Sequence, residues 1–161
     1  MAPAETMREF ASLDELQACV GEEVGVSDWL TIDQRRIDLF AEATGDQQWI
    51  HVDPAQAARG PYGMTIAHGL LTLSLIPLLS RQAMTIHNTR ISVNYGLNKV
   101  RFTAPVPVGS RVRGRFTLKS STALPDGGGK AGFQLVWEVT IEREGSDKPV
   151  CIAETISRRF P

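Results

Sequence analysis

The run from His68 to about Met84 limits most strongly what this chain can fold into. Its seven leucine and isoleucine residues fall on almost every side of a helix, and a helix that is apolar on every side has to be buried inside the protein. The run is too short to cross a bilayer and includes polar residues, so a membrane span is not expected. Pro77 in its interior is expected to kink the helix or to loosen one turn. The sequence therefore predicts a central, fully buried helix.

The segments on the two sides of this run differ in periodicity. Before it, capping boxes at Ser12–Glu15 and Thr31–Gln34 predict two helices, the second ending at Gly45. Asp53 and Pro54 predict a further short helix, as N-cap and first-turn proline. Alternating and β-branched residues predict strands over Val24–Leu30, Thr89–Tyr95, Asn98–Thr103, Ser110–Ser121, Ala131–Glu144 and Pro149–Arg159. An antiparallel sheet curved around the central helix would bury all these apolar faces, so the predicted fold class is α+β.

Composition excludes several classes of partner. The 161 residues are expected to form one domain over 1–161, and a net charge of -1 argues against binding nucleic acid or an anionic membrane.

Met1–Phe10 has no apolar signal core, so a cytoplasmic location is predicted. Cys19 and Cys151 are then expected to be buried, reduced thiols, too widely spaced for a zinc site. The glycine-rich Leu124–Lys130 is predicted to be a turn.

The segment Gly45–His51 (G-D-Q-Q-W-I-H) carries the chemistry. A carboxylate, Asp46, and an imidazole, His51, held in one pocket can share a water molecule and move its protons. Downstream, Ile66–Gly69 (I-A-H-G) opens the central helix, where the backbone N–H of Gly69 can polarise a carbonyl. The two segments together predict hydration chemistry on an activated carbonyl compound.

Each of these residues also has a plainer interpretation. Asp46 can be a turn residue and His51 a surface histidine. His68 is predicted to have a structural role, with its ring bonded to the backbone, and its alternatives are a catalytic role and substrate contact. Trp49 is expected to pack under the loop or to line the pocket mouth. Asp46, His51 and His68 have loose spacing for metal ligands, so no metal is predicted.

Three motifs occur in the order found in MaoC-like (R)-specific enoyl-CoA hydratases. They are G-D-x-x-x-x-H at Gly45–His51, I-A-H-G at Ile66–Gly69 and F-x-x-P-V-x-V-G at Phe102–Gly109. The stretch Asn94–Phe102 resembles the subgroup that contains nodulation protein NodN. The resemblance implies a hot-dog fold, a curved antiparallel sheet wrapped around a central helix.

The resemblance also implies a reaction. Asp46 and His51 would be the catalytic pair and the Gly69 N–H the oxyanion donor, so that one water adds reversibly to trans-2-enoyl-CoA and gives (R)-3-hydroxyacyl-CoA. No cofactor is implied, because coenzyme A is part of the substrate. The chain has Gln48 and Trp49 where the family usually has Asn-Pro. The Gln48 amide is predicted to bond the catalytic water or His51.

Further substrate contacts and a partner follow from the same resemblance. A serine of some hydratases would fall on Pro77, and Ser74 is predicted to replace it. A homodimer is expected, because a sheet of this kind leaves an edge strand that a second copy can extend. Asn94 and Asn98 are unusual polar residues for a strand and are predicted to face the neighbouring subunit's site. Lys99 and Arg101 can contact coenzyme A phosphates or solvent.

Two other functions fit the same motifs. A hot-dog thioesterase would use a carboxylate and water to hydrolyse the thioester instead of hydrating the double bond. A non-catalytic protein that binds acyl thioesters is the second alternative, and the changed residues Gln48 and Trp49 keep it open.

Overall fold

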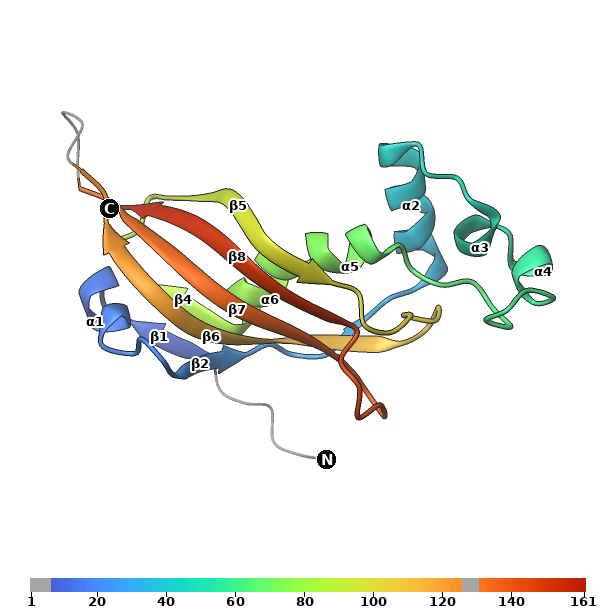
Figure 1. The fold of residues 1–161 in the computed structure, drawn as a ribbon, viewed down its shortest axis with the longest axis horizontal. Helices are drawn as coiled ribbons and strands as arrows, with labels where there is room; N and C mark the ends of the chain where they lie inside the picture. Colours follow the sequence, from blue (N-terminus) through green and yellow to red (C-terminus); the bar gives the residue numbers. More distant parts are fainter. Residues whose placement is uncertain (1–6, 126–130) are drawn as a thin grey trace.

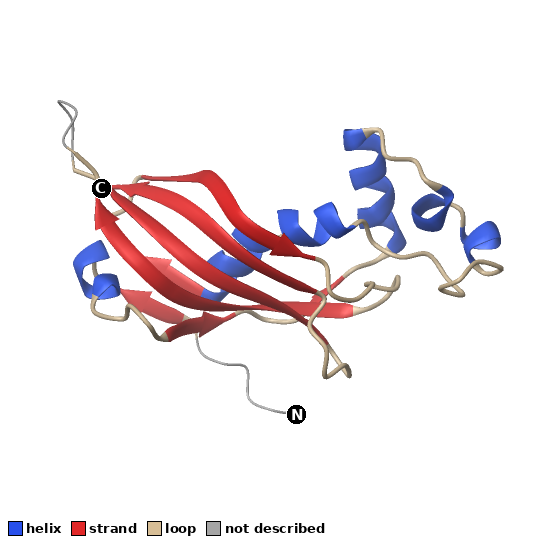
Figure 2. Ribbon diagram, viewed as in Figure 1, coloured by secondary structure: helices blue, strands red, loops and turns tan. Residues whose placement is uncertain are grey.

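A six-stranded antiparallel sheet curves around the central helix (Figures 1 and 2). The computed structural model describes residues 7–125 and 131–161. The strand order is β2-β6-β7-β8-β5, and β3 also pairs with β6. The strands are β2 (Glu23–Val26), β3 (Leu30–Thr31), β5 (Ile91–Arg101), β6 (Arg111–Ala123), β7 (Phe133–Arg143) and β8 (Cys151–Phe160). The predicted α+β layout is confirmed.

The central helix is interrupted, and only one of its sides is covered. It consists of α5 (Gly69–Ser74) and α6 (Ile76–Ala83), and Pro77 lies in the first turn of α6, so the predicted interruption is confirmed. Leu71 and Leu79 are buried, whereas Leu70 is 61% exposed. The prediction of burial on every side is therefore wrong for a single copy, because the helix packs on one concave sheet face and the described residues leave its other side partly exposed.

The remaining helices precede the central one. They are α1 (Leu13–Gln17), α2 (Gln34–Thr44), α3 (Trp49–Val52) and α4 (Pro54–Ala57). In Figure 1, α2, α3 and α4 lie beyond the end of the sheet, next to the start of α5. A separate parallel pair joins β1 (Arg8–Phe10) to β4 (Met84–Ile86). The short elements α3, β1 and β4 were not predicted, because segments of three or four residues are too short to show a period.

Local signals set most of the helix ends. Ser12 caps α1 as predicted, and the helix ends at Gln17. The cap of α2 is Asp33 and not Thr31, since the Asp33 carboxylate accepts the N–H of Arg36 at 2.9 Å.

The end of α2 and the start of α4 follow the predictions. Gly45 has a left-handed φ of 80° and ends α2. Asp53 caps α4 by accepting the N–H of Gln56 at 2.9 Å. These two helix ends fix the length of the segment between α2 and α4, which carries Asp46 and His51.

Two strand predictions needed correction. The predicted strand Val24–Leu30 is divided into β2 and β3, with residues 27–29 outside either strand. The predicted strands Thr89–Tyr95 and Asn98–Thr103 are one strand, β5, whose register with β8 shifts between Asn94 and Gly96 and again between Leu97 and Lys99. Such a bulge inserts an extra residue, which breaks the alternation from which strands are predicted.

Three further expectations concern single segments. Cys19 and Cys151 are buried and free, as predicted, and burial raises the pKa of the Cys151 thiol to about 11. The predicted turn Leu124–Lys130 and the start of Met1–Phe10 lie partly outside the described residues. Among the described helices, none has the length and apolar character to cross a membrane.

Candidate active site

His51 is a buried histidine on α3 with one ring nitrogen already used. Its Nδ1–H donates to the carbonyl of Ile66 at 2.7 Å, which leaves Nε2 as a hydrogen-bond acceptor. Burial lowers the pKa of His51, and His68 acts in the same direction, while the Ile66 carbonyl and the Asp46 carboxylate oppose the shift. The imidazole is therefore neutral at neutral pH and able to accept a proton.

His68 contacts both His51 and the backbone of Asp46. It is buried at the N-cap position of α5, and its ring stacks on that of His51 with centroids 3.8 Å apart. Its Nε2–H donates to the backbone carbonyl of Asp46 at 3.0 Å. This is the backbone bond expected for a structural role, and it ties the loop after α2 to the start of the central helix.

Asp46 follows the left-handed Gly45, and its carboxylate is exposed. One oxygen accepts the backbone N–H of Gln48 at a long 3.4 Å. Asp46, His51 and His68 each place a carboxylate oxygen or ring nitrogen within 4.8 Å of the others. The fold thus brings the predicted pair, Asp46 and His51, into one place at the amino end of α5.

The same three side chains have the composition of a metal site. The His51 and His68 rings are stacked at an interplanar angle of 24°, so the lone pairs of their free nitrogens lie in nearly parallel planes. The ligands of a single ion have to converge on it. The arrangement therefore suits a water held between Asp46 and His51 better than a bound cation.

Gly69 is the first residue of α5 and lines a cavity of about 340 Å³ together with His51. The first N–H groups of a helix have no partner within the helix, so this end can offer hydrogen bonds to the cavity. A Cβ at Gly69 would lie 2.7 Å from the ring of Phe102. Glycine thus allows close approach of a ligand to the backbone here.

Gln48 and Trp49 lie next to the site but do not line this cavity. Gln48 is exposed, and its backbone carbonyl accepts the N–H of His51 at 2.9 Å. Its side-chain amide makes no hydrogen bond to any residue within the described ranges, so the predicted bond to His51 is absent. The Trp49 ring packs so closely on Gly60 that a Cβ there would lie 2.8 Å from it. Trp49 therefore packs under the loop, the first of its two predicted roles.

The other predicted substrate residues lie elsewhere in the single copy. Ser74 is exposed at the end of α5, donates to the carbonyl of Leu71 at 2.7 Å, and lines a different cavity together with Asn94. Asn98 on β5 donates to Glu154 at 2.7 Å. The structure thus does not bring Ser74 to His51, because α5 carries it to its far end. Asn94 and Asn98 were predicted for a neighbouring subunit's site, which a single copy does not test.

Two residues at the site were not singled out from the sequence. Gln34 donates to the His51 carbonyl at 2.8 Å and accepts from Thr65 at 2.5 Å, so it joins α2 to α3 and to the segment before α5. Phe102 covers Gly69. The sequence pattern indicates only that Gln34 belongs to the start of a helix. It places Phe102 in a motif but does not indicate where that motif lies in the fold.

Comparison with known proteins decides the family. The family model described as MaoC like domain matches residues 15–128 of this chain. The chain belongs to the MaoC-like dehydratase family. It is 54% identical over 152 residues to 3-hydroxyacyl-thioester dehydratase Z of Mycobacterium tuberculosis, covering 94% of this chain and 98% of that protein. It is 45% identical over 148 residues to nodulation protein N of Rhizobium leguminosarum bv. viciae, covering 91% and 89%.

The fold comparison agrees. The R-hydratase PhaJ1 from Pseudomonas aeruginosa, in its unliganded form, superposes with a TM-score of 0.70 at 24% identity, over 92% of this chain and 84% of that one. The predicted hot-dog fold and the NodN-like MaoC assignment are confirmed.

Proposed function

We propose that the protein catalyses the reversible, (R)-specific addition of water to a trans-2-enoyl thioester. One observation carries the proposal: a ring nitrogen of neutral His51 and a carboxylate oxygen of Asp46 lie within 4.8 Å of each other, and His51 lines one cavity with Gly69 at the amino end of α5. A relative of 54% identity is named a 3-hydroxyacyl-thioester dehydratase, which supports the reaction class.

The proposed reaction starts with a water held between Asp46 and His51. The thioester carbonyl withdraws electrons from the double bond, so C3 is electrophilic. As the water oxygen bonds to C3, His51 Nε2 takes one of its protons and the double-bond electrons move onto the thioester oxygen. The Gly69 N–H stabilises that oxygen, a contribution on the order of 10²–10³ in rate.

The second step restores the site. The proton on His51 passes to C2 on the same face, and the enolate electrons form the new C2–H bond. The Asp46 carboxylate orients the water through its second hydrogen and stabilises the transient imidazolium, consistent with the way it raises the pKa of His51. Base catalysis of this kind contributes about 10²–10⁴-fold.

We also propose that a second copy extends the sheet at β5. This edge strand carries four exposed apolar side chains, Ile91, Val93, Tyr95 and Leu97, between 44% and 56% exposed. An open edge with apolar side chains favours pairing with another strand, and Asn94 and Asn98 would then face the partner copy. Sedimentation should give a dimer, and Val93→Glu should give monomers. A monomeric wild type would exclude this pairing.

The activity assay separates the three candidate functions. With crotonyl-CoA, hydration removes the absorbance of the enone. With a saturated acyl-CoA, a thioesterase releases free thiol and a hydratase does not. Thiol release without enone loss would replace the proposal with the thioesterase, and tight binding of an enoyl-CoA analogue without turnover would indicate a non-catalytic binding protein.

Other properties remain predictions from the sequence. The reaction as proposed uses no metal and no cofactor apart from the coenzyme A of the substrate. Chain-length preference, and the choice between coenzyme A and acyl carrier protein, can be read from a panel of enoyl thioesters of increasing length. A cytoplasmic location likewise stays a prediction.

A further inference from the structure

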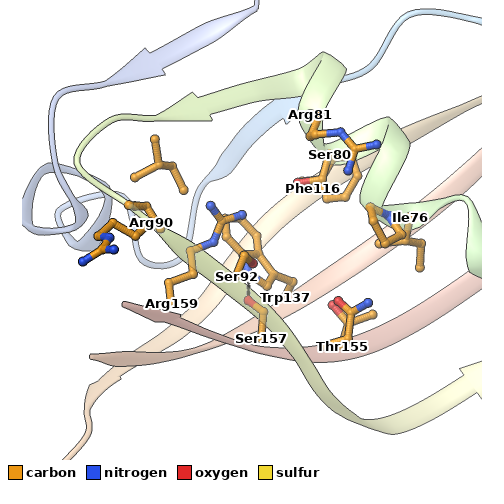
Figure 3. A pocket seen from close by; sticks show the side chains of 14 residues that line it. Ile76, Ser80, Arg81, Arg90, Ser92, Phe116, Trp137, Thr155, Ser157 and Arg159 are labelled. Atoms are coloured by element: carbon orange, nitrogen blue, oxygen red, sulfur yellow. Dashed lines mark hydrogen bonds between the residues drawn. The ribbon is translucent and has the colours of Figure 1, made fainter. Parts of the chain in front are cut away.

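A second cavity of about 330 Å³ lies at the other end of the central helix, between α6, β5 and β8 (Figure 3). It adjoins the cavity of about 370 Å³ that Ser74 lines, and the two share Ile76, Pro77, Asn94, Thr155 and Ser157. The shared residues place the two cavities side by side. Leu73, Leu97 and Ile156 give one cavity an apolar lining, and arginine and hydroxyl side chains line the other.

The polar lining of the cavity arises because the inward-facing residues of β8 change from apolar to polar along the strand. Cys151 and Ala153 face the core and are buried, but the next residues on that face are Thr155, Ser157 and Arg159. Their partners on β7 are apolar, since Trp137 pairs with Thr155 and Leu135 with Ser157. Polar groups on an inward face are costly unless they find hydrogen-bond partners, so this change of pattern calls for an explanation.

Arg159 lacks such a partner. Its Nε is buried and makes no hydrogen bond within the described residues, and the same is true of Thr89 Oγ1 in the cavity wall. Arg159 as a whole is partly buried, and this burial lowers the pKa of its guanidinium. On the outer face of the sheet, by contrast, Arg113 and Arg115 both bond to Glu142.

Among the three arginines that line the cavity, Arg159 is the one that is not exposed. No carboxylate is among the described residues that line it. Arg81 and Arg90 also line the cavity but are exposed, and Figure 3 shows the Arg90 guanidinium pointing away from that of Arg159. Ser92 pairs with Arg159 across the strands and places a hydroxyl beside it.

These features define one class of ligand. A single guanidinium forms two parallel hydrogen bonds to a carboxylate, and its one positive charge balances the one negative charge of that group. The adjoining apolar hollow suits a hydrocarbon chain. We propose that the cavity between α6, β5 and β8 binds a carboxylate carried on an apolar chain, with Arg159 as the residue that binds the carboxylate.

Binding of decanoate and of its uncharged methyl ester tests this site directly by calorimetry. The wild type should bind decanoate at least about tenfold more tightly than the ester, as a hydrogen-bonded charge would provide. Arg159→Gln should abolish the preference. Arg158→Gln is the matched control, because Arg158 precedes it on β8, stacks over Tyr95 at 3.5 Å and bonds to Gln134, outside the cavity. A preference that survives in Arg159→Gln, or no saturable binding by the wild type, overturns the site.

The fluorescence of Trp137 gives a measurement that does not depend on the folding of Arg159→Gln. Trp137 lines the cavity and donates to Ser157 at 3.3 Å (Figure 3). Decanoate should change the tryptophan emission of the wild type, and Trp137→Phe should lose that change. Decanoate binding with no Trp137-dependent signal would place the ligand elsewhere.

The carboxylate can belong to a free acid or to the far end of the substrate's acyl group. Kinetics with an enoyl-CoA that carries a terminal carboxylate separate the two sources, and this arm rests on the proposed function. If Arg159→Gln raises KM by about tenfold for that substrate and leaves crotonyl-CoA unchanged, the carboxylate is the substrate's own. If both KM values are unchanged while decanoate binding is lost, the ligand is a separate acid. Absence of hydration by the wild type would refute the proposed function and leave the binding result standing.

Discussion

The two ends of the central helix differ in how their buried polar side chains are anchored. At the amino end, His51 and His68 each use one ring nitrogen on a backbone carbonyl, which fixes the position of both rings, although the Nδ1 of His68 has no partner within the described residues. At the carboxyl end, Arg159 and Thr89 have buried polar atoms with no partner within the described residues. The first arrangement holds His51 in one tautomer with Nε2 as an acceptor, which suits the proton transfer that we propose for it. The second is suited to a ligand that supplies the missing partner.

The largest effect is expected from removing the acid–base pair. His51→Ala and Asp46→Asn should each lower turnover of crotonyl-CoA by about a hundredfold or more, since both hold the attacking water. Circular dichroism should remain native. Asp53→Asn is the matched control, because asparagine caps a helix as well as aspartate and Asp53 only caps α4. Near-normal hydration by either catalytic variant would refute the assignment.

A smaller loss is expected at Gly69. In Gly69→Ala the new Cβ meets the Phe102 ring and crowds the approach of the thioester, so kcat should fall about tenfold to a hundredfold. The double variant Gly69→Ala/Phe102→Ala removes the clash with the ring. If it restores full activity, the glycine serves only to accommodate Phe102, and the oxyanion role of its N–H loses support.

His68 should matter as a positioning residue. His68→Ala removes the bond to the Asp46 carbonyl and the stacking on His51, and kcat should fall about tenfold with little change in KM. His68→Gln keeps an N–H donor and should recover part of the loss. Equal losses in both variants would mean that stacking, and not the anchoring of Asp46, is what the site requires.

The pKa of His51 should set the pH dependence of both kcat/KM and stability. Because burial lowers its pKa below the ordinary 6.5, the acid limb of kcat/KM should lie below pH 6.5, where His51 gains a proton and stops acting as a base. Stability should follow the same sign. The unfolded chain binds the proton first, so the free energy of unfolding should decrease as pH falls through 6.5. NMR titration of His51 that gives a pKa at or above 6.5 would contradict both expectations.

The smallest effect is expected from chelation. Incubation with EDTA should leave hydration unchanged, because stacked rings do not converge on an ion. Loss of activity that Zn²⁺ restores would show that the group of Asp46, His51 and His68 holds a metal, and the water-only mechanism would then be wrong.

Local chemistry made much of the fold predictable. Gly45 ends α2 because glycine accepts a left-handed φ, and Asp53 caps α4 through its own carboxylate. The alternation along β6 and β7 gave those strands nearly in full. Where alternation failed, at the bulges of β5, the prediction failed too.

The sequence by itself determined that an aspartate and a histidine lie five residues apart, just before an apolar helix that opens with glycine. Only the tertiary structure decided the stacking of His51 on His68 and the Ile66 carbonyl that sets the tautomer of His51. It also decided the placement of Arg159, at the other end of the helix, in a cavity whose described lining contains no carboxylate. Caps and turns depend on neighbours along the chain, so their signals are local. Burial, ring stacking and pKa shifts depend on residues that are distant in sequence and meet only when the sheet curves around the helix.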